Sequence, residues 1–100
     1  MEKQTFSLDG TTVTGYCIPI GPVNLVFAET PRGLVGCGAV DVVALEKFSI
    51  PAAKVRPRDA DSIRNIDDLL TGTIAVVNTF ARDLGVKTDM TGKEALRLLI

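Results

Sequence analysis

The sequence predicts an α+β fold of two layers, an N-terminal antiparallel β-sheet with short helices packed on it. Residues 5–38 are rich in β-branched side chains and are interrupted by turn signals. From residue 41 onward, capping residues introduce stretches in which apolar residues recur at helical spacing. A chain of 100 residues, 46% of them hydrophobic, can fill one modest core, so we expect a single domain over residues 1–100.

The first part of the chain predicts four strands joined as an antiparallel meander. They are expected at residues 5–8, 11–20, 23–29 and 34–38. Asp9-Gly10 is a strong hairpin signal, and the segments 19–22 and 30–33 contain the Pro and Gly residues typical of turns. Connections this short favour antiparallel pairing of successive strands. With four predicted strands, residues 1–38 are expected to form the β-rich part of the domain.

The middle of the chain predicts a short helix and a further strand. Asp41 is a good N-cap for a helix that Pro51 stops. Residues 52–58 alternate as a strand, with Lys54, Arg56 and Arg58 on one face. Pro57 near its end favours an edge position, because proline cannot donate to a neighbouring strand.

The last part of the chain predicts three helices. The first begins after an Asn65 cap and ends at Gly72. The second is expected from Thr73 to Gly85, because its apolar residues at 74, 77, 81 and 84 recur at helical spacing. The third begins at Thr91-Gly-Lys-Glu94, a capping box in which threonine and glutamate satisfy each other's backbone N–H groups.

The composition excludes several classes of function. The net charge of −1, from 11 basic and 12 acidic residues, is too small to favour nucleic-acid binding. The absence of histidine removes Ser-His-Asp and Cys-His catalysis and histidine-based metal sites, and two cysteines 20 residues apart do not form a zinc motif. We therefore expect no metal and no cofactor. Without a signal-peptide core or an apolar run long enough for a bilayer, the chain is expected to be cytoplasmic, with reduced thiols and no membrane partner.

The most informative segment is Gly33 to Asp41, where a glycine-broken strand delivers Cys37 and then Asp41 to a helix start. A phosphate loop is disfavoured, because Asp41 stands where the GxGxxG pattern needs glycine and its carboxylate repels phosphate. Cys37 has two interpretations, a nucleophilic thiolate near a helix N-terminus or a small buried core residue. Asp41 is either a plain N-cap or an acid–base group beside Cys37.

Three further residues are candidates for ligand binding. Asn24 lies among apolar strand residues and could share a pocket with Cys37 and Asp41. Lys54 and Arg56 could hold an anion or an acidic partner, although positive charges that protect an edge strand from aggregation are the simpler explanation. Asp59 and Asp61 follow closely and would neutralise part of this charge.

The order of these segments resembles the YunC-like family, small uncharacterised proteins of bacteria and archaea. The resemblance covers nearly the whole chain and rests on Pro19, Asn24-Leu25, Gly33, Cys37–Asp41, Ile66–Leu70, Leu84-Gly85 and Met90–Leu96. The chain departs from the family's pattern after Leu45 and in the charged stretch from Val55 to Asp61. The resemblance implies an α/β two-layer fold and an N-terminal β region that mediates tetramer formation. It implies no established activity, cofactor or catalytic residue.

The sequence thus predicts a cytoplasmic protein that forms a homo-oligomer, a tetramer by the resemblance, through the strands of residues 1–38. High apolar content in a small chain agrees with a covered surface. Two alternatives stay open. One is a small-molecule binding or regulatory module with a pocket near Asn24, Cys37 and Asp41, and the other is a small enzyme that uses Cys37 or Asp41.

Overall fold

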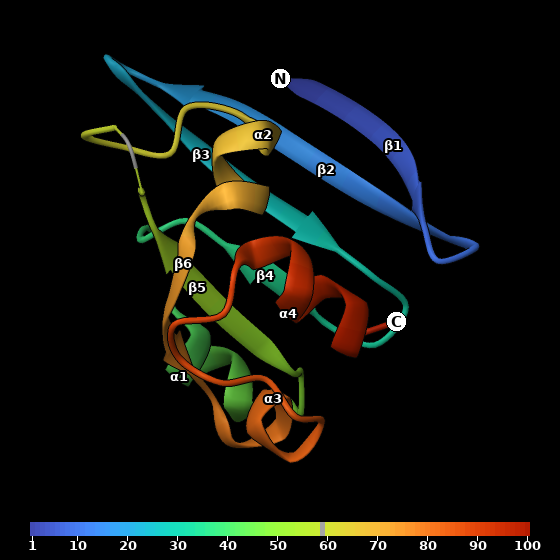
Figure 1. Cartoon of the computed structure of the whole chain (residues 1–100). Helices are drawn as coiled ribbons and strands as arrows, with labels where there is room; N and C mark the ends of the chain where they lie inside the picture. The colour runs from blue at the N-terminus through green and yellow to red at the C-terminus, as the bar shows by residue number, and fades with distance from the viewer. Residues whose placement is uncertain (59) are drawn as a thin grey trace.

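One six-stranded sheet, in the order β1-β2-β3-β4-β5-β6, organises the computed structural model, which describes residues 1–58 and 60–100. The strands are β1 (Glu2–Leu8), β2 (Thr11–Ile20), β3 (Val23–Glu29), β4 (Leu34–Gly36), β5 (Ala52–Arg56) and β6 (Thr73–Val77). The helices are α1 (Val42–Glu46), α2 (Ile66–Thr71), α3 (Thr79–Asp83) and α4 (Gly92–Leu98). Figure 1 shows the long strands β1 to β3 at one side of the sheet, with α2 and α4 lying over it. The predicted α+β class is confirmed.

Strands β1 to β4 form the antiparallel meander that the turn signals predict. Leu8 pairs with Thr11, so Asp9 and Gly10 form a two-residue hairpin loop, and both have positive φ, at 52° and 83°. A type I′ hairpin needs positive φ at both loop positions, which Asp-Gly tolerates well. β2 and β3 begin and end at the predicted residues, whereas β1 begins three residues earlier than predicted and β4 ends two residues earlier.

The sheet buries one face under α2 and α4. Register places Val13, Val26 and Ala28 on this face, and all three are fully buried. Gly15 lies there too, and a Cβ at this position would come within 2.6 Å of Ile66 Cδ1 of α2. A glycine in β2 thus lets α2 approach the sheet closely. Leu96 and Leu99, in and just after α4, complete the core, as the capping box at Thr91 and Glu94 predicts.

The prediction of one helix from Thr73 to Gly85 is wrong in its first half. Residues 73–77 form β6, which pairs antiparallel with β5, and only Thr79–Asp83 is helical. Three of the five β6 residues are Ile or Val, which favour strands once a neighbouring strand is available. Asn78 separates the two elements, because its side chain accepts from Ala81 N and caps α3.

The prediction that residues 52–58 form an edge strand is also wrong. β5 lies inside the sheet, parallel to β4 and antiparallel to β6, and it ends at Arg56, one residue before Pro57. Proline therefore terminates the strand without breaking a ladder. The edge explanation for the positive charges at Lys54 and Arg56 falls with this correction.

Candidate functional site

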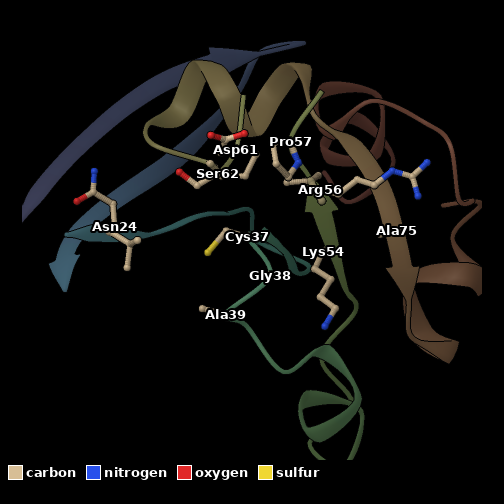
Figure 2. A pocket seen from close by; sticks show the side chains of 13 residues that line it. Asn24, Cys37, Gly38, Ala39, Lys54, Arg56, Pro57, Asp61, Ser62 and Ala75 are labelled. Atoms are coloured by element: carbon tan, nitrogen blue, oxygen red, sulfur yellow. The ribbon is translucent and has the colours of Figure 1, made fainter. Parts of the chain in front are cut away.

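A cavity of about 420 Å³ opens at the end of the sheet where the parallel strands β4 and β5 finish. Its walls come from the start of β3, the residues after β4, the second half of β5, the segment before α2 and one residue of β6. The lining residues are Val23, Asn24, Cys37, Gly38, Ala39, Lys54, Val55, Arg56, Pro57, Asp61, Ser62, Ile63 and Ala75. Figure 2 shows this arrangement around Cys37. Most of these side chains are apolar or small, so few polar groups would orient a bound molecule.

Cys37 lies directly after β4 and is 5% exposed. Its backbone N–H donates to Val26 O at 2.9 Å, and its Sγ accepts from Val26 N at 3.5 Å. The thiol is thus held against β3 while it lines the cavity. The burial of Cys37 agrees with the interpretation as a small core residue, and the side chain also lines the cavity.

Asn24 lies on the cavity wall, as the pocket hypothesis expects, and also has a structural role. Its Nδ2 donates to Arg64 O at 2.8 Å, and Cys17 Sγ donates to the same carbonyl at 3.4 Å. Burial raises the pKa of the Cys17 thiol, which keeps it protonated as this donor requires. These two bonds fasten the segment before α2 to strands β2 and β3 and so hold one side of the cavity in place.

The start of α2 is fastened by a second set of contacts. The Arg64 guanidinium donates to Asp68 Oδ2 at 2.8 Å, and this hydrogen bond holds the pKa of the Asp68 carboxyl below its ordinary range. Asp68 N donates to Asn65 Oδ1 at 2.8 Å, which confirms the predicted cap. The segment between Pro57 and α2 is therefore anchored at its far end.

Lys54 and Arg56 both line the cavity but differ in their surroundings. The Arg56 guanidinium lies 3.5 Å from Asp89 Oδ1 and points out of the cavity in Figure 2. Lys54 is half-buried, and Figure 2 shows it on the side of the cavity away from Asp61 and Ser62. Asp59, expected to offset this charge, lies outside the described residues.

Asp41 does not line the cavity, although the pocket hypothesis placed it there with Cys37 and Asn24. Its Oδ1 accepts from Ala44 N at 3.0 Å, so it is the N-cap of α1. The chain turns between the two residues, where Val40 N donates to Cys37 O at 3.1 Å. The structure therefore brings Asn24, Cys37, Lys54 and Arg56 together and leaves Asp41 at the exposed end of a helix.

Sequence reasoning missed Asn78, the polar residue that the structure buries most, at 3% exposed. Its Oδ1 accepts from Ala52 N and Ala81 N, and its Nδ2 donates to Val42 O and Ile50 O, all between 2.8 and 3.1 Å. The side chain joins α1, β5 and α3 below the sheet. The sequence did contain a signal for a helix start at Asn78. Asparagine is a preferred N-cap, and Asn78 follows an apolar run.

The face of β2 and β3 opposite the core is apolar and only partly covered. Tyr16, Ile18 and Phe27 are half-buried there, and the Tyr16 and Phe27 rings stack with centroids 4.8 Å apart. Ile20 and Val23, paired in register at the end of the same hairpin, are each 52% exposed. We call these five residues the hairpin face.

Within residues 1–58 and 60–100, no helix is long and apolar enough to cross a membrane. Within the same residues, no three cysteine or carboxylate side chains lie close enough together to hold a metal ion.

Comparison with known proteins identifies the family. The model of a family described as a domain of unknown function (DUF1805) matches residues 36–99. Uncharacterized protein YunC of Bacillus subtilis (strain 168) is 33% identical over 89 residues, which cover 89% of this chain and 87% of that protein. A protein of unknown function from Thermoplasma acidophilum, TA1206, has a crystal structure that superposes with a TM-score of 0.85 at 16% identity, over 99% of this chain and 92% of that chain, and so shares the fold. The family match contains Cys37, Lys54 and Arg56 together with every element from α1 to α4. The resemblance to the YunC-like family is thus confirmed, and this chain belongs to the DUF1805 family.

Proposed function

We propose that this domain is a small-molecule binding module and that the cavity beside Cys37 is its binding site. The observation that carries the proposal is a cavity of about 420 Å³ at the carboxyl ends of the parallel strands β4 and β5. Pockets for small ligands have volumes of roughly 300–1,000 Å³, with mostly apolar walls and a few placed polar groups.

The position of the cavity in the sheet supports this proposal. In α/β sheets, ligands bind in the crevice outside the carboxyl ends of parallel strands, because the chain leaves both strands there by diverging loops. β4 leaves toward α1 and β5 leaves toward the segment before α2, so the same divergence occurs here. The hydrogen bonds from Asn24 and Cys17 to Arg64 O hold the wall in place without a ligand.

The contacts of Cys37 and Asp41 favour binding over catalysis. The Cys37 thiol accepts from a backbone N–H, and the Asp41 carboxylate is occupied as a helix cap outside the cavity. A nucleophilic cysteine needs a neighbouring base or positive charge to become a thiolate. We therefore rank the enzyme hypothesis below the binding hypothesis.

A variant that fills the cavity tests the proposal. A Cβ built on Gly38 meets no atom within 4 Å, and its backbone has no positive φ, so Gly38→Leu is expected to fold normally. With 3-phenylpropanol as probe, titration followed by amide chemical shifts should move the signals of Cys37, Gly38 and Ala39 in the native protein. Gly38→Ala should keep this binding, and Gly38→Leu should weaken it at least tenfold. Equal binding by both variants, or no shift in the native protein with either this alcohol or the carboxylate of the same body, would refute the binding site.

We propose further that copies of the chain assemble through the hairpin face, within the β-rich region of residues 1–38. Its half-buried and exposed apolar side chains support this, because exposed apolar patches on small domains mark contact surfaces. The resemblance to YunC-like proteins favours a tetramer. We place this assembly in the cytoplasm, where the free thiols of Cys17 and Cys37 would stay reduced.

Light scattering after size-exclusion chromatography tests the assembly. The native chain should have four times the chain mass at high micromolar concentration, and Ile18→Lys and Ile20→Lys should shift it toward monomer. Phe48→Lys is the matched control, because Phe48 is 74% exposed and lies between α1 and β5, outside the hairpin face. If the native protein is a monomer, or if all three variants dissociate it equally, assembly through the hairpin face is contradicted.

A further inference from the structure

We propose that the molecule bound in this cavity is a small organic carboxylate with an apolar body and that Lys54 holds its charged group. The inference rests on the binding function proposed above and adds the chemical class of the ligand. It follows from the position of Lys54, from the ion pairs that nearby arginines make and from the apolar side chains of the remaining walls.

Lys54 supplies a positive charge to one wall of the cavity. It is the middle residue of β5, a strand inside the sheet, and register places it between Gly36 of β4 and Val76 of β6. Register through Phe27 and Gly36 places Lys54 on the face of the sheet opposite α2 and α4. The residue is half-buried there and lines the cavity. Protection of a sheet edge does not explain it, because β5 is not at the edge.

Two other cations near the cavity, Arg56 and Arg64, have carboxylate partners. Arg56 lies 3.5 Å from Asp89, and Arg64 binds Asp68 at 2.8 Å. Among residues 1–58 and 60–100, no carboxylate lies within 4.0 Å of the Lys54 ammonium. Of the two cations that line the cavity, Arg56 has a carboxylate partner and Lys54 has none among the described residues, so the Lys54 charge is available to a ligand. A charged partner there would form a charge-assisted hydrogen bond in a partly dry site, where such bonds are strongest.

The other walls indicate what the anion carries. Beyond Lys54, the cavity is bounded by apolar or small side chains such as Val23, Ala39, Val55 and Ile63, which suit an apolar body. Asp61 lies on the side away from Lys54 and would repel a second negative charge.

A carboxylate fits these walls better than a phosphate. Phosphate sites normally gather several donors, from glycine-rich loops, helix N-termini or clustered cations. The N-terminus of α1 does not supply such donors freely, because the Asp41 carboxylate already accepts from Ala44 N. One lysine facing an apolar cavity matches a single negative charge.

Three probes with the same phenylpropyl-type body separate the alternatives: 3-phenylpropionate, 3-phenylpropanol and 3-phenylpropylphosphonate. Their affinities are measured by titration of the full chain, followed through the amide signals of residues 37–39. The native protein should bind 3-phenylpropionate at least tenfold more tightly than 3-phenylpropanol, a factor equivalent to about 1.4 kcal/mol. Lys54→Met should remove this preference and leave alcohol binding unchanged, because methionine keeps the apolar stem.

Lys47→Met is the matched control, since Lys47 is exposed at the end of α1 and does not line the cavity. It should keep the tenfold preference. Equal binding of carboxylate and alcohol by the native protein overturns the inference and leaves the binding site standing. No shift with any probe overturns both. Tighter binding of the phosphonate overturns the choice of carboxylate. If Lys54→Met dissociates the assembly and leaves the preference unchanged, the anion belongs to a second copy, and the inference is wrong.

Discussion

Replacing Asn78 with alanine should destabilise the protein far more than the loss of a helix cap does. The cap to Ala81 N alone contributes about 1 kcal/mol. The change also leaves Ala52 N and Val42 O without their partners, and both bonds are buried. A buried polar group without a partner costs about 1–3 kcal/mol. The expected total is about 4 kcal/mol, a large part of the 5–15 kcal/mol that stabilises a typical domain.

Urea unfolding followed by circular dichroism measures this loss, and Asn65→Ala supplies the comparison. Asn65 is an exposed cap whose Oδ1 accepts only from Asp68 N among the hydrogen bonds found, so its loss should cost about 1 kcal/mol. If Asn78→Ala loses no more free energy of unfolding than Asn65→Ala, the junction around Asn78 is not held by its side chain. The reasoning about buried partners would then be wrong.

Three further predictions concern other parts of the molecule. A Cβ at Gly33 would collide with the carbonyl oxygen of Pro51, so Gly33→Ala should cost at least about 2 kcal/mol in urea unfolding, whereas Gly38→Ala should cost less than about 0.5 kcal/mol. The Glu94 carboxylate accepts from Thr91 N, which lowers its pKa, so its stabilising effect is complete above the ordinary glutamate pKa of about 4.3 and is lost as the pH falls below it. Glu94→Gln keeps an acceptor and should flatten the decline of the urea midpoint between pH 5 and pH 3, and an unchanged decline contradicts the assignment. The thiol of Cys37, 5% exposed, should react with a thiol reagent at least about tenfold more slowly in the native protein than in urea, and equal rates would contradict its burial.

The fold was predictable wherever local chemistry decides the structure. Asp9-Gly10 specifies a hairpin by the φ angles that it tolerates, and Thr91 with Glu94 specifies a helix start by two reciprocal hydrogen bonds. β6 was not predictable in this way, because Ile74 and Val77 fit helical spacing as well as a strand. The neighbour that favours the strand is β5, and strand order is a property of the whole chain.

The candidate site was predictable in part for the same reason. Asn24 and Cys37 reach one cavity because β3 and β4 are adjacent antiparallel strands, a pairing that the short turn between them predicts. Asp41 follows Cys37 closely in sequence, but a turn closed by Val40 N and Cys37 O carries it away. Pairing across a hairpin therefore predicted which residues share the cavity better than closeness in the sequence did.

The parallel pairing of β4 with β5 accounts for both the cavity and the charge within it. Parallel neighbours need a crossover, here through α1, so both strands finish at the same end of the sheet and their chains diverge there. The same pairing places Lys54 inside the sheet, where a positive charge has no role against edge-to-edge aggregation. A half-buried lysine that lines a cavity and does not protect an edge needs another explanation. A ligand anion supplies one, and the loss of carboxylate preference in Lys54→Met is the measurement that decides it.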